Sequence, residues 1–229
     1  IKIYKMNYKD SSIKKEIDEI ISLHKKNLFE QALKKTDILY KLNPNNALIF
    51  NAYGIIYASL KNFEKSIDFF SKAINLEPEY IKAHYNLAKI LTHLGKFEEA
   101  SRCYAKIIKI KPDFAEDYFN LGKLLHNLGK LEESIHNYTK AIELKPNYID
   151  AHKNLIKILS YHNPQKKNLN SYVLTNKLLQ SINLNFNAKE KIFDGDVTNF
   201  FQRCNEVIVK NMKNLNIEEV QIYRRNTFR

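Results

Sequence analysis

Apolar side chains recur along residues 47–148 at the spacing of one face of an α-helix. Leu87, Ile90, Leu91 and Leu94, for example, stand at positions i, i+3, i+4 and i+7. No stretch before residue 160 alternates apolar and polar residues with a period of two, which a half-buried strand would require. The pattern predicts a succession of short amphipathic helices and therefore an all-α fold.

The helical pattern is interrupted at a fixed interval. Pro44, Pro78, Pro112 and Pro146 stand 34 residues apart, and each should end a helix because proline lacks an amide donor and disfavours helix in the residue before it. A constant period of this length is typical of a solenoid. We predict an N-terminal extension, an array of repeats over 13–182 and a C-terminal extension, with these boundaries: 1–12; repeats 13–46, 47–80, 81–114, 115–148 and a degenerate 149–182; and 183–229.

Several positions recur together within the repeat. They comprise a small residue where the two helices cross, a small residue opposite it, an aromatic residue expected to fill the gap between successive repeats, and a turn glycine: Gly54, Ala88 and Gly122; Ala32, Ser66, Ala100 and Ser134; Phe70, Tyr104 and Tyr138; Gly95 and Gly129. Ile20 and Ile156 stand at the crossing position in the outer repeats, which marks these repeats as atypical.

Together these positions resemble the tetratricopeptide repeat (TPR), a 34-residue helix–turn–helix family. The resemblance implies a right-handed α-solenoid, here with a divergent C-terminal extension. In style the repeats are most similar to the superhelical arrays attached to O-linked N-acetylglucosamine transferases. Such solenoids are far more often binding scaffolds than enzymes.

The regular pattern ends after His162. Asn163-Pro164 stands where the turn within the fifth repeat should be, and helical patterns resume over 172–182 and 196–215. Residues 219–223 alternate weakly, like a strand. Because the chain starts at Ile1 and ends within a pattern, we expect a fragment of a longer protein, with 183–229 either a frayed tail or the start of a further domain.

Charge and cysteine content narrow the class of partner and the compartment. The net charge of +12 divides into +4 over residues 1–46, +2 over 47–148 and +6 over 149–229. The repeats are therefore nearly neutral, without the concentrated basic stripe of a nucleic-acid module. Cys103 and Cys204 form no disulfide-dense pattern, which predicts a reducing compartment, the cytoplasm. The sequence has no run of eighteen apolar residues, so it predicts no membrane span.

The resemblance also implies which side chains face the concave groove of the array. Asn51 is one of them, and the residues that we predict to bind a peptide are Lys82, Tyr85, Asn86, Lys89, Phe119, Asn120, Lys123, Lys153, Asn154 and Lys157. The asparagines offer an amide donor and a carbonyl acceptor to an extended backbone. The lysines favour carboxylates or phosphate, and the two aromatic residues are typical anchors.

The asparagines and the lysines each also have a plainer interpretation. Asparagine belongs to the average sequence of the family at its position, and lysines can simply solvate a surface. Both interpretations remain open at this point. The two-carboxylate clamp of chaperone-binding relatives is not supported, since Lys82 matches one of its positions and the repeat two units later, 149–182, contains no arginine.

No cofactor or metal motif is present, and His84 and His152 stand at a position where packing explains them better than metal binding. Cys103 is better explained as a buried small hydrophobe than as a catalytic thiol. We predict a non-enzymatic scaffold that binds a protein or peptide partner, extended and acidic. The alternatives are a substrate-recruiting region of a glycosyl- or sulfotransferase whose catalytic domain lies beyond Arg229, and single-stranded RNA binding through the basic flanks. The partner's identity and the oligomeric state are not legible from the sequence.

Overall fold

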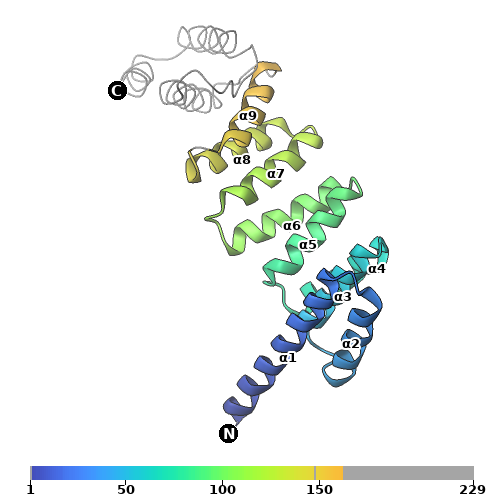
Figure 1. Cartoon of the computed structure of the whole chain (residues 1–229). Coiled ribbons are helices and arrows are strands. Elements are labelled where there is room, and N and C mark those ends of the chain that lie inside the picture. Colours follow the sequence, from blue (N-terminus) through green and yellow to red (C-terminus); the bar gives the residue numbers. More distant parts are fainter. Residues whose placement is uncertain (1, 147, 162–229) are drawn as a thin grey trace, which may run out of the picture. The chain divides into compact units, whose positions relative to one another are not determined.

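The computed structural model describes residues 2–146 and 148–161, which form helices joined by short connections (Figure 1). The all-α solenoid of helix–turn–helix repeats is confirmed for these residues. The elements predicted at 172–182, 196–215 and 219–223 lie outside them. The helices are α1 (Lys2–Lys25), α2 (Phe29–Leu42), α3 (Ala47–Ser59), α4 (Phe63–Leu76), α5 (Ile81–His93), α6 (Phe97–Ile110), α7 (Ala115–Asn127), α8 (Leu131–Leu144) and α9 (Ile149–Tyr161).

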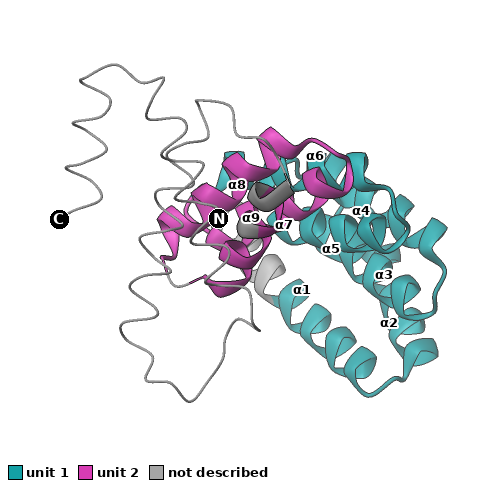
Figure 2. Cartoon of the chain, turned by 90° about the horizontal axis from the view of Figure 1, so that it is seen from above, with its two compact units in different colours: residues 1–112 teal, residues 113–229 magenta. Residues whose placement is uncertain are grey.

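The chain divides into two compact units, residues 1–112 and 113–229 (Figure 2). Unit 1 contains α1 to α6, and the described part of unit 2 contains α7 to α9. In both units the helix starts follow the 34-residue period, at 47, 81, 115 and 149 for first helices and at 29, 63, 97 and 131 for second helices. Helix α1 departs from this rule, because it begins at Lys2 and runs for 24 residues.

The turn inside each repeat has the same backbone geometry whatever residue occupies it. Asn27, Lys61, Gly95 and Gly129, again 34 apart, all have positive φ, between 59° and 73°. The next amide then bonds back to the first helix, as in Lys96 N–H to Leu91 C=O at 2.8 Å. This is the Schellman arrangement that satisfies carbonyls at a helix end. The glycine turns were predicted, whereas the same conformation at Asn27 and Lys61 was not.

Close helix crossings hold the two helices of a repeat together. A Cβ built on Gly54 would clash with the ring of Phe70, 2.4 Å from its nearest carbon, and one on Gly122 would lie 2.8 Å from the Tyr138 ring. At the same crossings the hydroxyl of Ser66 donates to the Gly54 carbonyl at 2.8 Å, and Ser134 does so to Gly122. The predicted small positions are thus confirmed, and each aromatic ring lies against the first helix of its own repeat.

In the first repeat the large and the small side chain of the helix crossing are reversed. Ile20 of α1 is large and buried where the later repeats have glycine or alanine. Position 36, which corresponds to Phe70 and Tyr138, holds the small and fully buried Thr36. The side chains have exchanged sizes, so the atypical Ile20 is compatible with a close-packed pair.

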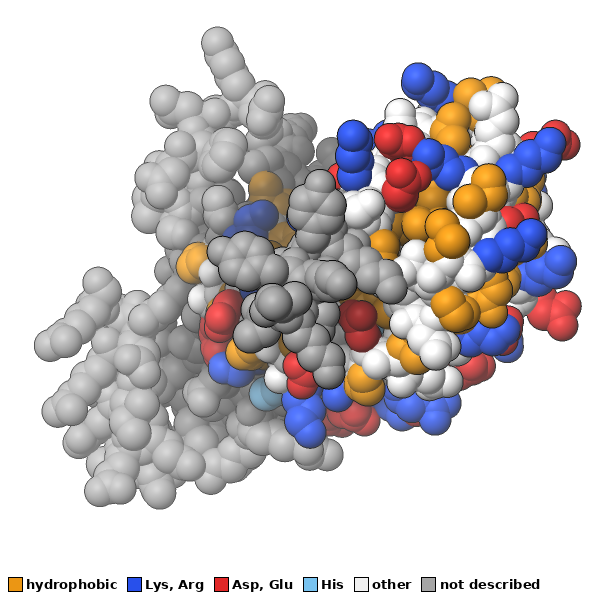
Figure 3. Space-filling view, turned by 90° about the horizontal axis from the view of Figure 1, so that it is seen from below, with side chains coloured by type: hydrophobic (Ala, Val, Ile, Leu, Met, Phe, Trp, Pro, Cys, Tyr) orange, Lys and Arg blue, Asp and Glu red, His pale blue; other side chains and the backbone are white. Residues whose placement is uncertain are grey.

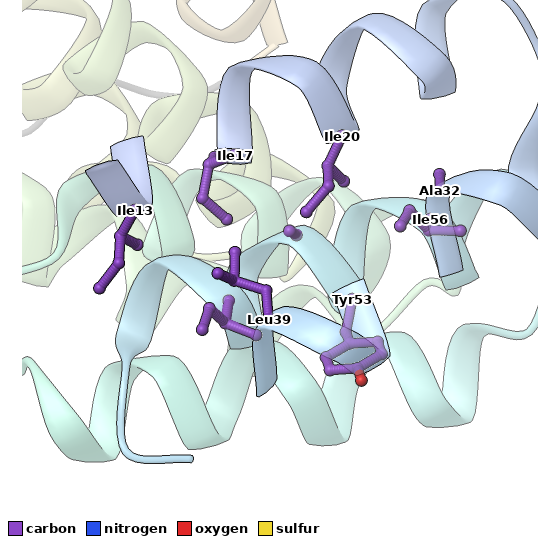
Figure 4. Close-up of a cluster of buried hydrophobic side chains, with 9 residues drawn as sticks. Ile13, Ile17, Ile20, Ala32, Leu39, Tyr53 and Ile56 are labelled. Atoms are coloured by element: carbon purple, nitrogen blue, oxygen red, sulfur yellow. The ribbon is translucent and has the colours of Figure 1, made fainter. Parts of the chain in front are cut away.

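The core of unit 1 is continuous across its first three helices (Figure 4). Ile13, Ile17 and Ile20 of α1 pack with Leu39 of α2 and with residues of α3, including Ile56. An ion-pair cluster stands beside this core, where Lys35 of α2 bonds Glu16 and Glu19 of α1 at 2.9 and 2.6 Å. Apolar burial is the larger stabilising contribution, since exposed ion pairs contribute at most about 1 kcal/mol.

The core of unit 2 joins α8 to α9. Tyr138, Ile135 and Ile142 of α8 pack with Ala151 and Leu155 of α9. Tyr138 therefore contacts the following repeat as well as its own, in line with the predicted role of the aromatic position.

Two buried histidines, on α5 and α9, each form a hydrogen bond with the connection that precedes their helix. Nε2 of His84 donates to the Pro78 carbonyl, and Nε2 of His152 donates to the Pro146 carbonyl, both at 3.0 Å. The corresponding residues in the second and fourth repeats are the aromatic Phe50 and Tyr118. The interpretation of these histidines as packing residues is confirmed.

His152 should make the stability of the chain depend on pH. Its burial lowers the pKa of the imidazole below the usual 6.5, against a smaller opposing contribution from the Pro146 carbonyl. The stability that this group contributes is complete above the unfolded-state pKa and is lost as the pH falls through it toward the folded-state pKa.

The pH dependence of the wild-type stability is compared with that of His152→Tyr. This variant carries at position 152 the residue type found at the corresponding position 118. In urea unfolding at pH 7.5 and pH 5.5, we expect the wild type to lose more stability on acidification than the variant. Equal losses in the two proteins would exclude His152 as the source.

Candidate functional site

One face of α5 in unit 1 carries the first group of predicted binding residues. Lys82, Tyr85, Asn86 and Lys89 stand at i, i+3, i+4 and i+7 and so share one side of the helix. The two lysines are exposed, whereas Tyr85 and Asn86 are half-buried. Helix α5 contains no aspartate or glutamate. Both charged side chains that α5 contributes to this face are therefore positive.

Asn86 is bonded to the neighbouring first helix. Its Nδ2 donates to Oδ1 of Asn51 on α3 at 2.9 Å. Asn51 is 7% exposed, so the bond lies at the base of the surface between α3 and α5. The sequence placed Asn51 on the groove side but gave no indication of this contact, because it depends on the relative rotation of two helices.

Tyr85 is supported from behind by a second ring. Its centroid lies 6.0 Å from that of Tyr104 on α6, at an interplanar angle of 75°. Edge-to-face pairs of this kind are favourable and hold both rings in one orientation. Tyr85 thus combines a partly exposed ring with a fixed position.

In unit 2 the second group lies on α7. Phe119 packs between Tyr138 and Tyr148, at ring distances of 5.8 and 4.8 Å. The Nζ atom of Lys123 lies 5.6 Å from the centre of the Phe119 ring. The lysine and the aromatic residue predicted separately therefore form one cation–π pair. Asn120 is half-buried on the same helix.

The third group lies on α9 of unit 2. Lys153 and Lys157 are exposed, and Asn154 is half-buried. Nδ2 of Asn154 donates to the Asp150 carbonyl, one turn earlier on the same helix, at 3.0 Å. Here again the amide nitrogen of the asparagine is used inside the protein.

Other groups that could carry chemistry have structural positions. Cys103 is buried, and burial raises the pKa of its thiol to about 11, so the unreactive protonated form prevails at neutral pH. Across the described ranges, no cluster of three His, Cys, Asp or Glu side chains could hold a metal ion. None of the described helices combines the length and the apolar character needed to cross a bilayer.

The sequence pattern did not predict an aromatic cluster that lies in unit 1. Tyr53, Tyr57 and Phe69 stack with centroid distances of 4.7 Å for Tyr53–Phe69 and 5.5 Å for Tyr57–Phe69. Lys65 and Lys72 lie over the Tyr57 and Phe69 rings, at 5.0 and 5.1 Å. In the face drawn in Figure 3, lysine and arginine side chains likewise alternate with hydrophobic and acidic ones. Such mixing gives no single-sign basic surface for nucleic acid.

Comparison with known proteins finds relatives over part of the chain. The uncharacterised protein ycf37 of Cyanophora paradoxa is 32% identical over 94 residues, which are 39% of this chain and 55% of that protein. The peroxisomal targeting signal receptor of Saccharomyces cerevisiae is 30% identical over 87 residues, 37% of this chain and 14% of the receptor. The chain thus spans about half of the first relative and a small part of the second.

Solved structures share the fold over a larger part of the chain. MamA (41-end) from Desulfovibrio magneticus RS-1 superposes with a TM-score of 0.59 at 21% identity, covering 74% of this chain and 96% of that one. YrrB, described as "a TPR protein with an unusual peptide-binding site", gives a TM-score of 0.59 at 22% identity, covering 74% and 87%.

Two family descriptions account for the periodic part of the sequence. "TPR repeat" matches residues 54–95 and 88–129, and "Tetratricopeptide repeat" matches residues 115–148. These matches coincide with the helix pairs, the small crossing residues and the turns described above. Residues 54–148 of this chain are tetratricopeptide repeats.

Proposed function

We propose that this chain is a non-enzymatic scaffold that binds an extended, acidic segment of a partner protein. The observation that carries the proposal is the α5 face, where Lys82 and Lys89 flank Tyr85 and Asn86 with no acidic residue on the helix. Neither lysine forms an ion pair with any other described residue. Both cations are therefore available to a carboxylate.

The groups on this face suit a peptide in three ways. The lysines attract carboxylates, Tyr85 offers a rigid ring that an apolar side chain can cover, and Asn86 offers a hydrogen bond to the main chain. In unit 2, Phe119, Asn120 and Lys123 on α7 and Lys153, Asn154 and Lys157 on α9 would make contacts of the same kinds.

The relatives support the class of function. The names of two similar proteins refer to a targeting signal receptor and to a peptide-binding site. TPR proteins of this kind are protein-interaction scaffolds, and the proposal extends that role to an acidic peptide.

Reversal of the α5 charges should abolish most of the binding. The probe is a fluorescein-labelled 14-residue peptide of alternating glutamate and alanine, titrated with the whole chain and followed by fluorescence anisotropy. For Lys82→Glu combined with Lys89→Glu, we expect affinity to fall at least about tenfold, which corresponds to about 1.4 kcal/mol. Salt should weaken wild-type binding as well, because exposed charges are screened.

The matched control reverses two exposed lysines of α2, Lys34 and Lys41, which changes the net charge equally. The control variant should retain wild-type affinity to within about twofold. An equal loss in both variants would mean that only net charge matters, and unchanged affinity in the α5 variant would contradict the proposal.

A further inference from the structure

The Asn51–Asn86 bond fixes which end of the Asn86 amide is presented to a ligand. An asparagine side chain carries an NH2 group with two N–H donors, Nδ2, and an acceptor, Oδ1, on opposite sides of one planar group. Because Nδ2 of Asn86 donates to Asn51, the carbonyl oxygen of Asn86 is turned away from α3.

The buried position of Asn51 makes this orientation costly to reverse. If the Asn86 amide turned alone, its oxygen would face the oxygen of Asn51, and the Asn51 oxygen would lose the N–H that donates to it. The bond would be kept only if the nearly buried Asn51 turned as well. The residues that correspond to Asn51 in the following repeats are Tyr85, Phe119 and Lys153, so an asparagine–asparagine pair of this kind does not recur there. The pairing is therefore particular to α3 and α5.

Asn154 in unit 2 reaches the same polarity by another route. One N–H of its Nδ2 donates to the carbonyl of Asp150 on its own helix, so the orientation of its amide is also set by the nitrogen. Two of the predicted asparagines, Asn86 and Asn154, thus use one N–H of the amide inside the protein. The second N–H of each amide and its carbonyl oxygen are not used in these bonds.

We propose that Asn51 is a positioning residue that holds Asn86 as a hydrogen-bond acceptor, so that this face recognises main-chain N–H groups of the bound segment. The inference rests on the proposed function, because it concerns the same α5 surface. It excludes segments whose nitrogen opposite Asn86 carries no hydrogen, such as proline.

The orientation itself can be measured without a ligand. In 1H–15N spectra of the whole chain, the side-chain NH2 pair of Asn86 should exchange slowly with water in the wild type and in Asn51→Asp, which keeps an acceptor. In Asn51→Leu the pair should exchange at the rate of an exposed asparagine. We expect Asn51→Leu to fold, because the next two repeats carry large aromatic residues at this position. Unchanged exchange of the NH2 pair in Asn51→Leu would overturn the positioning role.

Binding of the glutamate–alanine probe tests the acceptor role. We expect Asn86→Ala and Asn51→Leu each to lower affinity by about fivefold, the effect of one hydrogen bond. A probe methylated on every main-chain nitrogen has no N–H group and should bind the wild type more weakly. That methylation effect should be smaller in Asn86→Ala, because the acceptor is already gone.

The outcomes separate the two ideas. If Asn86→Ala weakens binding but the methylation effect is the same in both proteins, the acceptor role is overturned and peptide binding stands. If the probe does not bind the wild type at all, or binds independently of Lys82 and Lys89, the proposed function itself fails.

Discussion

Gly54→Val should lower the free energy of unfolding by about 3 kcal/mol, the upper part of the range for overpacked cores. A Cβ at position 54 would fall 2.4 Å from Cε1 of Phe70, a ring that is itself 1% exposed. Neither partner can move away easily, because Ser66 ties the two helices together at the same point. The measurement is urea unfolding followed by circular dichroism.

Two further variants distinguish a steric cause from a general effect of mutation. Ala88 stands at the corresponding position of the next repeat, where a methyl group already fits, so Ala88→Gly should destabilise by about 1 kcal/mol through lost helix propensity. Phe70→Leu combined with Gly54→Val should restore part of the stability, because the smaller side chain gives way. A wild-type unfolding midpoint for Gly54→Val would show that this crossing is not close-packed.

Tyr138→Ala is expected to cost about 3–5 kcal/mol, the usual range for deletion of a buried aromatic side chain. Tyr138 is fully buried and joins α7, α8 and α9 by covering Gly122 and packing with Ala151 and Leu155. In a repeat protein such a side chain supports both its own helix pair and the interface to the next one. Urea unfolding gives the magnitude, and hydrogen exchange should show α8 and α9 losing protection together.

The conservative control is Tyr138→Phe, which introduces the residue type found at position 70. It should remain within about 1 kcal/mol of the wild type, because the ring and its contacts are kept. A loss as large as that of Tyr138→Ala would assign the stability to the hydroxyl group instead of to ring burial.

Much of the fold was predictable because the residues that determine the packing of a helix pair lie within one repeat. The proline period, Gly54, Gly122 and the serines opposite them report contacts within one helix pair, and these contacts have a fixed sequence separation. The size exchange between Ile20 and Thr36 was not predicted, since it is visible only when two positions are considered as a pair.

The candidate site was predictable to a lesser degree. The positions on α5, α7 and α9 follow from helical periodicity, so their shared faces were expected. The Asn51–Asn86 bond and the packing of Phe119 against Tyr148 depend on how neighbouring helices are rotated about their axes, and a single sequence does not encode that rotation in any local pattern.

The left-handed turn at Lys61 has a consequence for how the array tolerates change. Glycine adopts this conformation freely, whereas a lysine gives up about 1–2 kcal/mol to do so. The packing of α3 against α4 therefore holds Lys61 in a backbone conformation that it does not favour. The residue at this turn can consequently differ among the helix pairs of one chain, while the length and backbone path of the turn stay constant.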